Sequence, residues 1–316
     1  MTWYNGILLV DKPRGVSSAK VVGILRHIIR QKKIGHTGTL DPEATGLLVM
    51  CLGRATKIAR FLTGLDKTYE ARIELGVRSV TYDTEGIDES SRIDPPPLSD
   101  DDLRGILDEF EGLRTQQVPA YSAVKVDGQR LYKMVRRGEK VTPPERLVDI
   151  KCIRLMQYDA PFLHLTVTCS KGTYIRSLAN DIGERIGCGA CLTGLNRTRV
   201  GDFEVAAALA VNDIEACFQS GRLEQYIHPI ENVLRLPAIE VARAFAPAVI
   251  AGKKLRLEDI ADIRGEFEID ECISLVDHRG KIMAIGKADI NSARLRRRDT
   301  EDIDGAGLFT YLRVLN

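Results

Sequence analysis

The hydrophobic pattern of the first 76 residues predicts short strands and one amphipathic helix. Residues 7–10 form an apolar run typical of a buried strand, and residues 47–51 fit a buried strand or the start of a helix. Between them, apolar residues recur at helical spacing behind Ser17 or Ser18, either of which can cap the helix. Residues 67–76 alternate with the period of a strand. The apolar helix positions are Val21, Val22, Leu25, Ile28 and Ile29, and those on one side of the strand are Tyr69, Ala71, Ile73 and Leu75.

The pattern between residues 83 and 186 continues this irregular mixture. Residues 83–98 are rich in Asp and Pro and are typical of a surface loop, after which Leu98 and Ser99 introduce a capped acidic helix. Residues 118–146 form a long basic segment that is too irregular for a core. A strand is predicted over 162–169 and a helix over 177–186. Because strands and helices do not alternate regularly, we predict an α+β domain with a mixed, largely antiparallel sheet flanked by helices.

The texture of the chain changes near residues 230–237. From there short alternating segments dominate, such as 273–277 and 281–286, and residues 277–280 have the composition of a hairpin turn. We therefore expect two domains, residues 1–232 and a small β-rich domain over 237–316.

Composition places the chain among soluble globular proteins. With 316 residues and 44% apolar residues it can bury a full core, and it has neither an apolar run of membrane-spanning length nor a signal peptide at residue 1. The 7 cysteines are scattered, which suits a reducing cytoplasm. Cys188 and Cys191 form a single C-x-x-C without two further ligands nearby, so we expect no metal.

Charge is segregated although the net charge is only +1. Residues 1–75 hold twelve Lys/Arg and six Asp/Glu, residues 83–111 hold two and eleven, and residues 112–151 hold nine and four. Such segregation is compatible with a one-sided positive face of the kind that binds nucleic acid, although charge runs are usually solvated surface.

The loop over residues 35–48 is the strongest candidate for chemistry. Gly35, Gly38 and Gly46 permit unusual backbone angles, and Pro42 pushes Asp41 out of the helical region. The loop would hold one carboxylate at a fixed place at the edge of a core. The alternative is an ordinary tight turn, because Asp-Pro commonly forms turns.

Five motifs occur in one order: residues 11–18 (DKPRGVSS), the 35–48 loop, 67–69 (KTY), 119–125 (PAYSAVK) and 172–176 (GTYIR). Over residues 5–230 the chain resembles the TruB family of tRNA pseudouridine synthases, in its bacterial branch. Residues 237–312 are similar to a PUA domain, a small β-barrel that binds RNA. Several motifs in the correct order are far more specific than one alone.

The resemblance implies isomerisation of uridine 55, in the T loop of tRNA, to pseudouridine. The N1–C1′ bond breaks, the base turns, and it rejoins through C5, so no cofactor is expected. Asp41 matches the family's catalytic aspartate; whether it attacks C1′ or removes the 2′-proton stays open. Arg176 matches the arginine that pairs with this aspartate, which would keep it ionised and oriented.

Further side chains are assigned by the same resemblance. Tyr69 matches the tyrosine on which the base stacks, with one face of a strand as the alternative. Tyr174 matches a second active-site tyrosine, and in an extended segment it would face the same side as Arg176. His36 would meet displaced RNA bases or act as a structural hydrogen bonder, and Leu195 would line the uracil pocket or belong to the core. Lys12 with Pro13 would support the floor of the site or touch the RNA backbone. Lys67 would meet a phosphate.

The basic segment 118–146 lies where the bacterial family carries an inserted loop that clamps the T arm. Its cations are Lys125, Arg130, Lys133, Arg136, Arg137 and Lys140. The expected partner is therefore tRNA, with no obligate protein partner and no membrane.

Three alternatives remain. Guide-RNA-dependent, dyskerin-type synthases belong to the same family, but they lack the long basic insertion. A non-catalytic RNA-folding protein would be expected to lack Asp41 or Arg176. A glycosidase or nucleosidase would need a second carboxylate beside Asp41, for which Glu43 is the neighbouring candidate.

Overall fold

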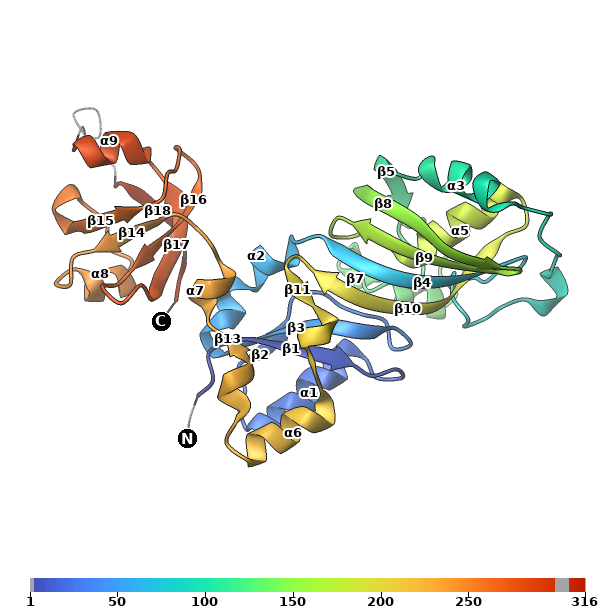
Figure 1. Ribbon diagram of the computed structural model, residues 1–316, viewed down its shortest axis with the longest axis horizontal. Helices are drawn as coiled ribbons and strands as arrows, with labels where there is room; N and C mark the ends of the chain where they lie inside the picture. Colours follow the sequence, from blue (N-terminus) through green and yellow to red (C-terminus); the bar gives the residue numbers. More distant parts are fainter. Residues whose placement is uncertain (1–2, 299–306, 316) are drawn as a thin grey trace.

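Two β-sheets organise the protein (Figure 1), as seen in a computed structural model that describes residues 3–298 and 307–315. The larger sheet has the order β12-β1-β3-β10-β4-β9-β8-β5, with β2, β11 and β13 attached. Within it β1 runs parallel to β12 and β3 runs parallel to β10, while the other pairs are antiparallel. The prediction of a mixed, largely antiparallel sheet is confirmed. Its strands are β1 (Gly6–Lys12), β2 (Ile34–His36), β3 (Thr45–Leu52), β4 (Lys67–Leu75), β5 (Gly112–Gln117), β8 (Glu145–Asp159), β9 (Phe162–Cys169), β10 (Ala190–Val200), β11 (Phe203–Glu204), β12 (Leu209–Ala210) and β13 (Ile227–His228).

The half of this sheet built on β1 and β3 is covered on both faces. Helices α1 (Ser18–Ile29) and α6 (Val211–Gln219) pack on one face, where Leu25 and Ile214 are fully buried. Ser17 caps α1 by accepting a hydrogen bond from the Lys20 amide, as one of the two predicted capping residues. The other face packs against α2 (Ala59–Thr63), α7 (Ile230–Val233) and the C-terminal domain.

The half built on β10, β4, β9, β8 and β5 is covered on one face only. Helices α3 (Asp100–Asp108) and α5 (Ile175–Ile186) bury Leu103, Leu107, Leu178 and Ile182 against it. Strand β9 alternates between buried and half-buried residues along its length, as a strand with one covered face should.

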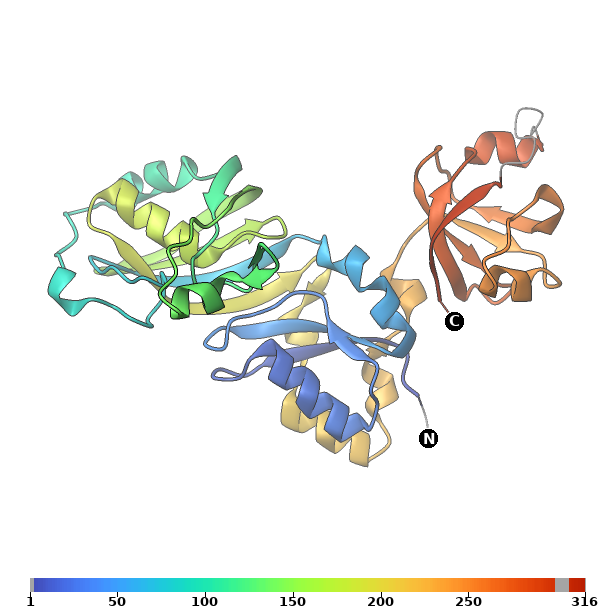
Figure 2. The same cartoon turned by 180° about the vertical axis from the view of Figure 1, so that it is seen from behind.

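The basic segment 118–146 projects from the end of β5 and returns into β8. It contains the hairpin strands β6 (Lys125–Val126) and β7 (Gln129–Arg130), followed by helix α4 (Leu131–Arg136). Figure 2 shows this green segment on the side of the molecule that faces the viewer. The segment was expected to be too irregular for a core; it contains a short helix, whose Leu131 is fully buried.

The C-terminal domain has its own sheet, with the order β15-β14-β16-β17-β18. The turn over residues 277–280 joins β16 to β17, as predicted, and the Asp277 side chain accepts hydrogen bonds from the amides of Arg279 and Lys281. Some residues of the predicted domain, 299–306 and 316, lie outside the described part of the chain. Its elements are β14 (Ala238–Val241), α8 (Ala246–Ile250), β15 (Ile260–Arg264), β16 (Cys272–Val276), β17 (Ile282–Ala288), α9 (Ser292–Arg297) and β18 (Phe309–Val314).

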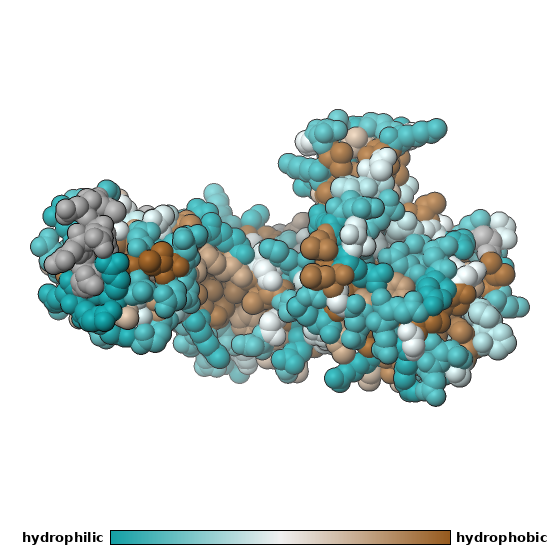
Figure 3. All heavy atoms as spheres, turned by 90° about the horizontal axis from the view of Figure 1, so that it is seen from above, coloured by the Kyte–Doolittle hydropathy of each residue, from teal (hydrophilic) through white to brown (hydrophobic). Residues whose placement is uncertain are grey.

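An apolar junction joins the two domains. Ile58 and Leu62 of the larger domain share a buried cluster with Val276 and Ile285 of the smaller one. Apolar atoms are visible in the recess between the domains when the molecule is viewed from above (Figure 3). The helices of the described residues include none that is long and apolar enough to cross a membrane.

Candidate active site

The loop that carries Asp41 is fixed at the residues on either side of the acid. The Ser18 hydroxyl donates to the Leu40 carbonyl and accepts from the Leu40 amide, at 3.0 and 2.9 Å. On the other side, the Pro42 carbonyl accepts from the Lys12 ammonium at 3.0 Å and from the Gly15 amide at 2.9 Å. These backbone contacts hold the loop without using the Asp41 carboxylate, whose side chain stays 46% exposed.

Lys12 is a structural cation beneath this loop. Its side chain is fully buried, and its ammonium donates to the carbonyls of Pro13, Val16 and Pro42 at 2.9, 2.7 and 3.0 Å. Burial lowers the pKa of Lys12, while the nearby carboxylates of Glu43 and Asp41 act in the opposite direction. Of its two predicted roles, the geometry matches support of the floor.

Arg176 brings three separate segments together around Asp41. Its Nε lies 3.0 Å from Asp41 Oδ2 as an ion pair, and its Nη1 lies 3.4 Å from Asp83 Oδ2. The same guanidinium donates to the carbonyls of Thr81 and Tyr121, at 3.0 and 3.2 Å. The side chain is only 7% exposed, so little water competes for these contacts. The Nε–H is not aligned for a hydrogen bond, which makes the Asp41 contact purely ionic.

Asp83 is a site residue that the sequence did not reveal. The Thr81 hydroxyl donates to Asp83 Oδ1 at 2.6 Å and thereby orients the carboxylate. Tyr82, between them, adopts φ 60, a left-handed conformation that is unusual for a residue with a side chain. No motif signals this position, because Asp83 begins an Asp-rich stretch that has the composition of an ordinary loop.

Tyr69 and Leu195 lie on the covered face of the sheet. Tyr69 is 8% exposed and packs in the same buried cluster as Leu40 and Ala44 of the Asp41 loop, and Leu195 is half-buried beside it. Burial raises the pKa of the Tyr69 phenol, while the guanidinium of Arg197 acts against this shift. Both predicted pocket residues therefore lie on the side of the sheet where Asp41 is held.

Arg197 is a second residue that the sequence analysis missed. It is 2% exposed, and its guanidinium donates to carbonyls on both sides of the Asp41 loop. A signal was available: with the period of a strand, Arg197 falls on the same face as Leu195, where a cation is out of place unless it is bonded.

His36 ends β2 at the entrance to the loop. Its Nδ1 is buried without a hydrogen-bond partner, and burial, followed by the charge of Arg197, lowers the pKa of the ring. The lowered pKa favours the neutral ring at neutral pH.

Tyr174 occupies a different position from the one expected. Helix α5 starts at Ile175, so Arg176 lies in its first turn, and the prediction of one extended segment carrying both side chains on the same side is wrong. The cause is Gln116, whose amide bonds both the backbone N–H and the C=O of Tyr174, at 2.8 and 3.1 Å, and fixes the helix start. The Tyr174 ring packs near the guanidinium of Arg146, 5.7 Å from the ring centroid.

Lys67 is buried rather than presented to solvent. Its ammonium donates to the carbonyls of Thr63, at 2.8 Å, and of Leu65. Burial lowers its pKa to about 8. This position leaves little of the cation for an RNA phosphate.

The predicted clamp cations are all exposed on the segment that contains α4. They are Lys125, Arg130, Lys133, Arg136, Arg137 and Lys140. Arg137 pairs with Glu139 at 2.7 Å, and the Arg136 guanidinium lies 5.8 Å from the Tyr132 ring centroid. The segment touches the site directly, because the Tyr121 carbonyl accepts from Arg176.

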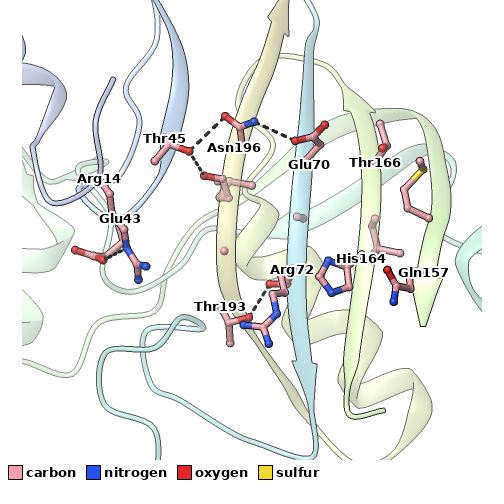
Figure 4. A pocket seen from close by; sticks show the side chains of 15 residues that line it. Arg14, Glu43, Thr45, Glu70, Arg72, Gln157, His164, Thr166, Thr193 and Asn196 are labelled. Atoms are coloured by element: carbon pink, nitrogen blue, oxygen red, sulfur yellow. Dashed lines mark hydrogen bonds and ion pairs between the residues drawn. The ribbon is translucent and has the colours of Figure 1, made fainter. Parts of the chain in front are cut away.

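A pocket of about 510 Å³ opens on the other face of the sheet. In Figure 4, Thr45, Asn196 and Glu70 are linked in a row by hydrogen bonds along its floor. None of Asp41, Tyr69, Tyr174 or Arg176 lines it, although Leu195, one of the predicted site residues, does. Glu43 is at its rim, paired with Arg14 at 2.8 Å, and does not form a second carboxylate beside Asp41.

In residues 3–298 and 307–315 no three His, Cys, Asp or Glu side chains are grouped so that they could hold a metal ion. Cys188 and Cys191 are buried free thiols, and burial raises the pKa of Cys191 to about 12.

Three family models match consecutive parts of the chain. They are the TruB family pseudouridylate synthase N-terminal domain over residues 26–175, the tRNA pseudouridylate synthase B C-terminal domain over 176–235 and the PUA domain over 237–303.

Curated relatives cover most of the chain. A protein named tRNA pseudouridine synthase B from Xanthomonas axonopodis pv. citri (strain 306) is 46% identical over 228 residues, or 72% of this chain and 74% of the relative. The protein of that name from Bacillus velezensis is 38% identical over 290 residues, or 89% of this chain and 92% of the relative.

Solved structures share the fold. A chain of an H/ACA RNP bound to a substrate RNA containing 2′-deoxyuridine has a TM-score of 0.74 at 23% identity, covering 98% of this chain and 85% of that one. A chain of a Cbf5-Nop10-Gar1 complex has a TM-score of 0.74 at 24% identity, with the same coverage of 98% and 85%. At such identities the likeness concerns the fold alone.

Proposed function

The chain belongs to the TruB family of pseudouridylate synthases, and from this premise we propose that it converts uridine 55 in the T loop of tRNA to pseudouridine. The observation that carries the proposal is the ion pair between Arg176 and Asp41 at the edge of the buried Tyr69 cluster. It places a carboxylate that is still 46% exposed to a substrate against a buried guanidinium.

The chemistry asks for such a carboxylate beside the sugar. Breaking the N1–C1′ bond leaves positive charge at C1′, which a carboxylate stabilises by attack or by removing the 2′-proton. The base then bonds to C1′ through C5, the proton on C5 is lost through a basic group, and N1, which no longer carries the sugar, takes up a proton, so that the atoms balance. No electron is gained or lost in this isomerisation. Asp41 is the acid we assign to it, and Arg176, held in turn by Asp83, keeps the carboxylate in place.

The base must leave the RNA stack before the carboxylate can reach its sugar. Tyr69 is the aromatic surface we assign to the extruded base, with Leu195 beside it and the neutral ring of His36 at the entrance. Tyr174 is assigned more loosely, to the wall formed with Arg146.

We assign binding of the tRNA T arm to the exposed cations of residues 118–146. The segment that carries these cations contacts the site, because the Tyr121 carbonyl accepts a hydrogen bond from Arg176. This contact supports a clamp that closes beside Asp41. The division into residues 1–232 and 237–316 is supported by the separate sheets, since β13 ends one and β14 begins the other. The PUA domain supplies a second RNA-binding surface.

The test compares the parent with Asp41→Asn on an unmodified tRNA transcript. Glu43→Gln is the matched control, because Glu43 is two residues away and faces Arg14 instead of Arg176. Pseudouridine is quantified by mass spectrometry, and a transcript with cytidine at position 55 tests the position. We expect product from the parent and from Glu43→Gln only. The proposal would be overturned if the parent made no pseudouridine or if Asp41→Asn made as much as the parent. It would also be overturned if the parent made pseudouridine at another position of the cytidine transcript.

A further inference from the structure

The two halves of the large sheet are joined by a very short ladder. Strands β3 and β10 pair only through Thr45 with Asn196 and Gly46 with Arg197. Gly46 has φ 95, and a Cβ there would lie 2.4 Å from the Arg197 carbonyl oxygen, so the strands approach too closely for any side chain. Asp41 belongs to the first half and Tyr69 to the second, so this joint sets their relative position.

Two side chains bond across the joint: Thr45 of β3 donates to Asn196 Oδ1 at 3.3 Å on the half-exposed face, and Arg197 of β10 bonds back on the buried face. Arg197 Nε donates to the Leu47 carbonyl at 2.8 Å, and Nη2 donates to the Gly38 carbonyl at 3.0 Å. Leu47 lies in β3, and Gly38 lies in the loop three residues before Asp41. Arg197 of β10 is paired directly opposite Tyr69 of β4. The positive charge of Arg197 acts to lower the pKa of the Tyr69 phenol.

The guanidinium has no carboxylate partner among the described ion pairs. A cation that is 2% exposed is costly to bury, and here its guanidinium donates to two backbone carbonyls. Its planar fork directs two N–H groups to two carbonyls at once, which a lysine ammonium on a flexible stem does not reproduce.

We propose that Arg197 is a positioning residue that clasps the two half-sheets, so that Asp41 and Tyr69 face the same substrate at a fixed separation. The proposal rests on the proposed function and adds to it a residue that does not touch the substrate. A displacement of about 1 Å in such a site is enough to reduce a rate roughly 100-fold.

The experiment uses the full-length protein with Arg197→Met, Arg197→Lys and the control Arg199→Met. Arg199 lies on the same strand but is exposed, with its guanidinium 3.5 Å from Glu204. Single-turnover rates at saturating tRNA and dissociation constants are measured separately, after thermal melting has established which variants are folded. The pKa of His36, read by NMR, reports the charge at position 197, because the charge of Arg197 contributes to its low value.

We expect Arg197→Met to reduce the single-turnover rate roughly 100-fold with a dissociation constant close to that of the parent. Arg197→Lys keeps the charge, and with it the low His36 pKa, yet its rate should still fall, because one ammonium replaces a two-pronged contact. Arg199→Met should keep the parent rate.

A folded Arg197→Lys with the parent rate would overturn the clasp, whatever the stability of Arg197→Met. If a higher tRNA concentration restored the parent rate, the clasp would also be overturned, because Arg197 would then act in RNA binding. If the parent itself makes no pseudouridine, the proposed function fails and the clasp falls with it; product at equal rates from parent and variants refutes the clasp alone.

Discussion

Replacing Lys12 by Met tests whether the Asp41 loop is held from below. Methionine has a similar length and volume but removes the ammonium, which donates to the carbonyls of Pro13, Val16 and Pro42. The Pro42 carbonyl keeps its second donor, the Gly15 amide at 2.9 Å. The substitution therefore leaves the carbonyls of exposed Pro13 and half-buried Val16 without this donor.

The expected cost follows from these two carbonyls. A buried polar group that loses its partner costs about 1–3 kcal/mol, and relief from burying the ammonium offsets part of the sum. Because Pro13 is exposed and water can replace the lost donor at its carbonyl, we expect the free energy of unfolding to fall by about 1–3 kcal/mol. This lowers the melting temperature by roughly 2–12 °C for a domain of this size. The rate should fall further than the loss of folded protein explains, because Pro42 is bonded next to Asp41.

The assay combines thermal melting with single-turnover pseudouridine formation, measured well below the melting temperature of the variant. Lys20→Met is the matched control, because Lys20 is exposed on α1 and should change the stability by less than about 0.5 kcal/mol. A stability loss below about 1 kcal/mol would contradict the estimate for orphaned carbonyls. A rate at fully folded conditions equal to that of the parent would show that the loop does not need Lys12.

Three further outcomes are expected. Asp83→Asn keeps an acceptor for the Thr81 hydroxyl but removes one of the two carboxylates beside Arg176. The single-turnover rate should fall by about 10- to 100-fold with tRNA affinity little changed, and a larger loss of affinity than of rate would refute this. Replacing both Lys133 and Arg136 by Ala should flatten the plot of log affinity against log salt by roughly 1–2 units, whereas Arg104→Ala, on α3, should not, and equal slopes would exclude a clamp. Lys67 has a pKa of about 8 in the folded chain against 10.5 for the free side chain, so between those pH values the unfolded state binds more protons. The free energy of unfolding should therefore rise with pH in this range by up to about 1.4 kcal/mol per pH unit. Urea titrations of Lys67→Met should lack this rise.

Elements with a clear period were predictable from the sequence. Strand β9 has the predicted bounds, and α1 has the predicted buried face with Ser17 as its cap. These features depend on neighbours within a few residues, which is the range over which burial and capping act. The prediction for α5 started two residues late, because the contact that fixes its start comes from Gln116, 58 residues away.

The residues of the candidate site that could be predicted are those that belong to motifs. Asp41 and Arg176 belong to recognisable motifs, and their side chains are in contact. Asp83 and Arg197 belong to none, and their importance arises where strands distant in sequence meet, as at the pairing of β3 with β10. The acceptors that fix the guanidinium of Arg197 are backbone carbonyls. Every residue carries a carbonyl, so no residue type marks these acceptors in the sequence.

Three buried cations surround one half-exposed acid. Lys12, Arg176 and Arg197 are each nearly inaccessible to water, and two carboxylates, Asp41 and Asp83, lie against Arg176 alone. The repulsion between the cations is visible in the pKa of Lys12, which the charge of Arg197 helps to lower. Backbone carbonyls partly compensate this positive charge, and a bound polyanion compensates it further. On the proposed function, a bound tRNA backbone should therefore stabilise the contacts that hold the Asp41 loop, so that RNA binding and the positioning of Asp41 reinforce each other.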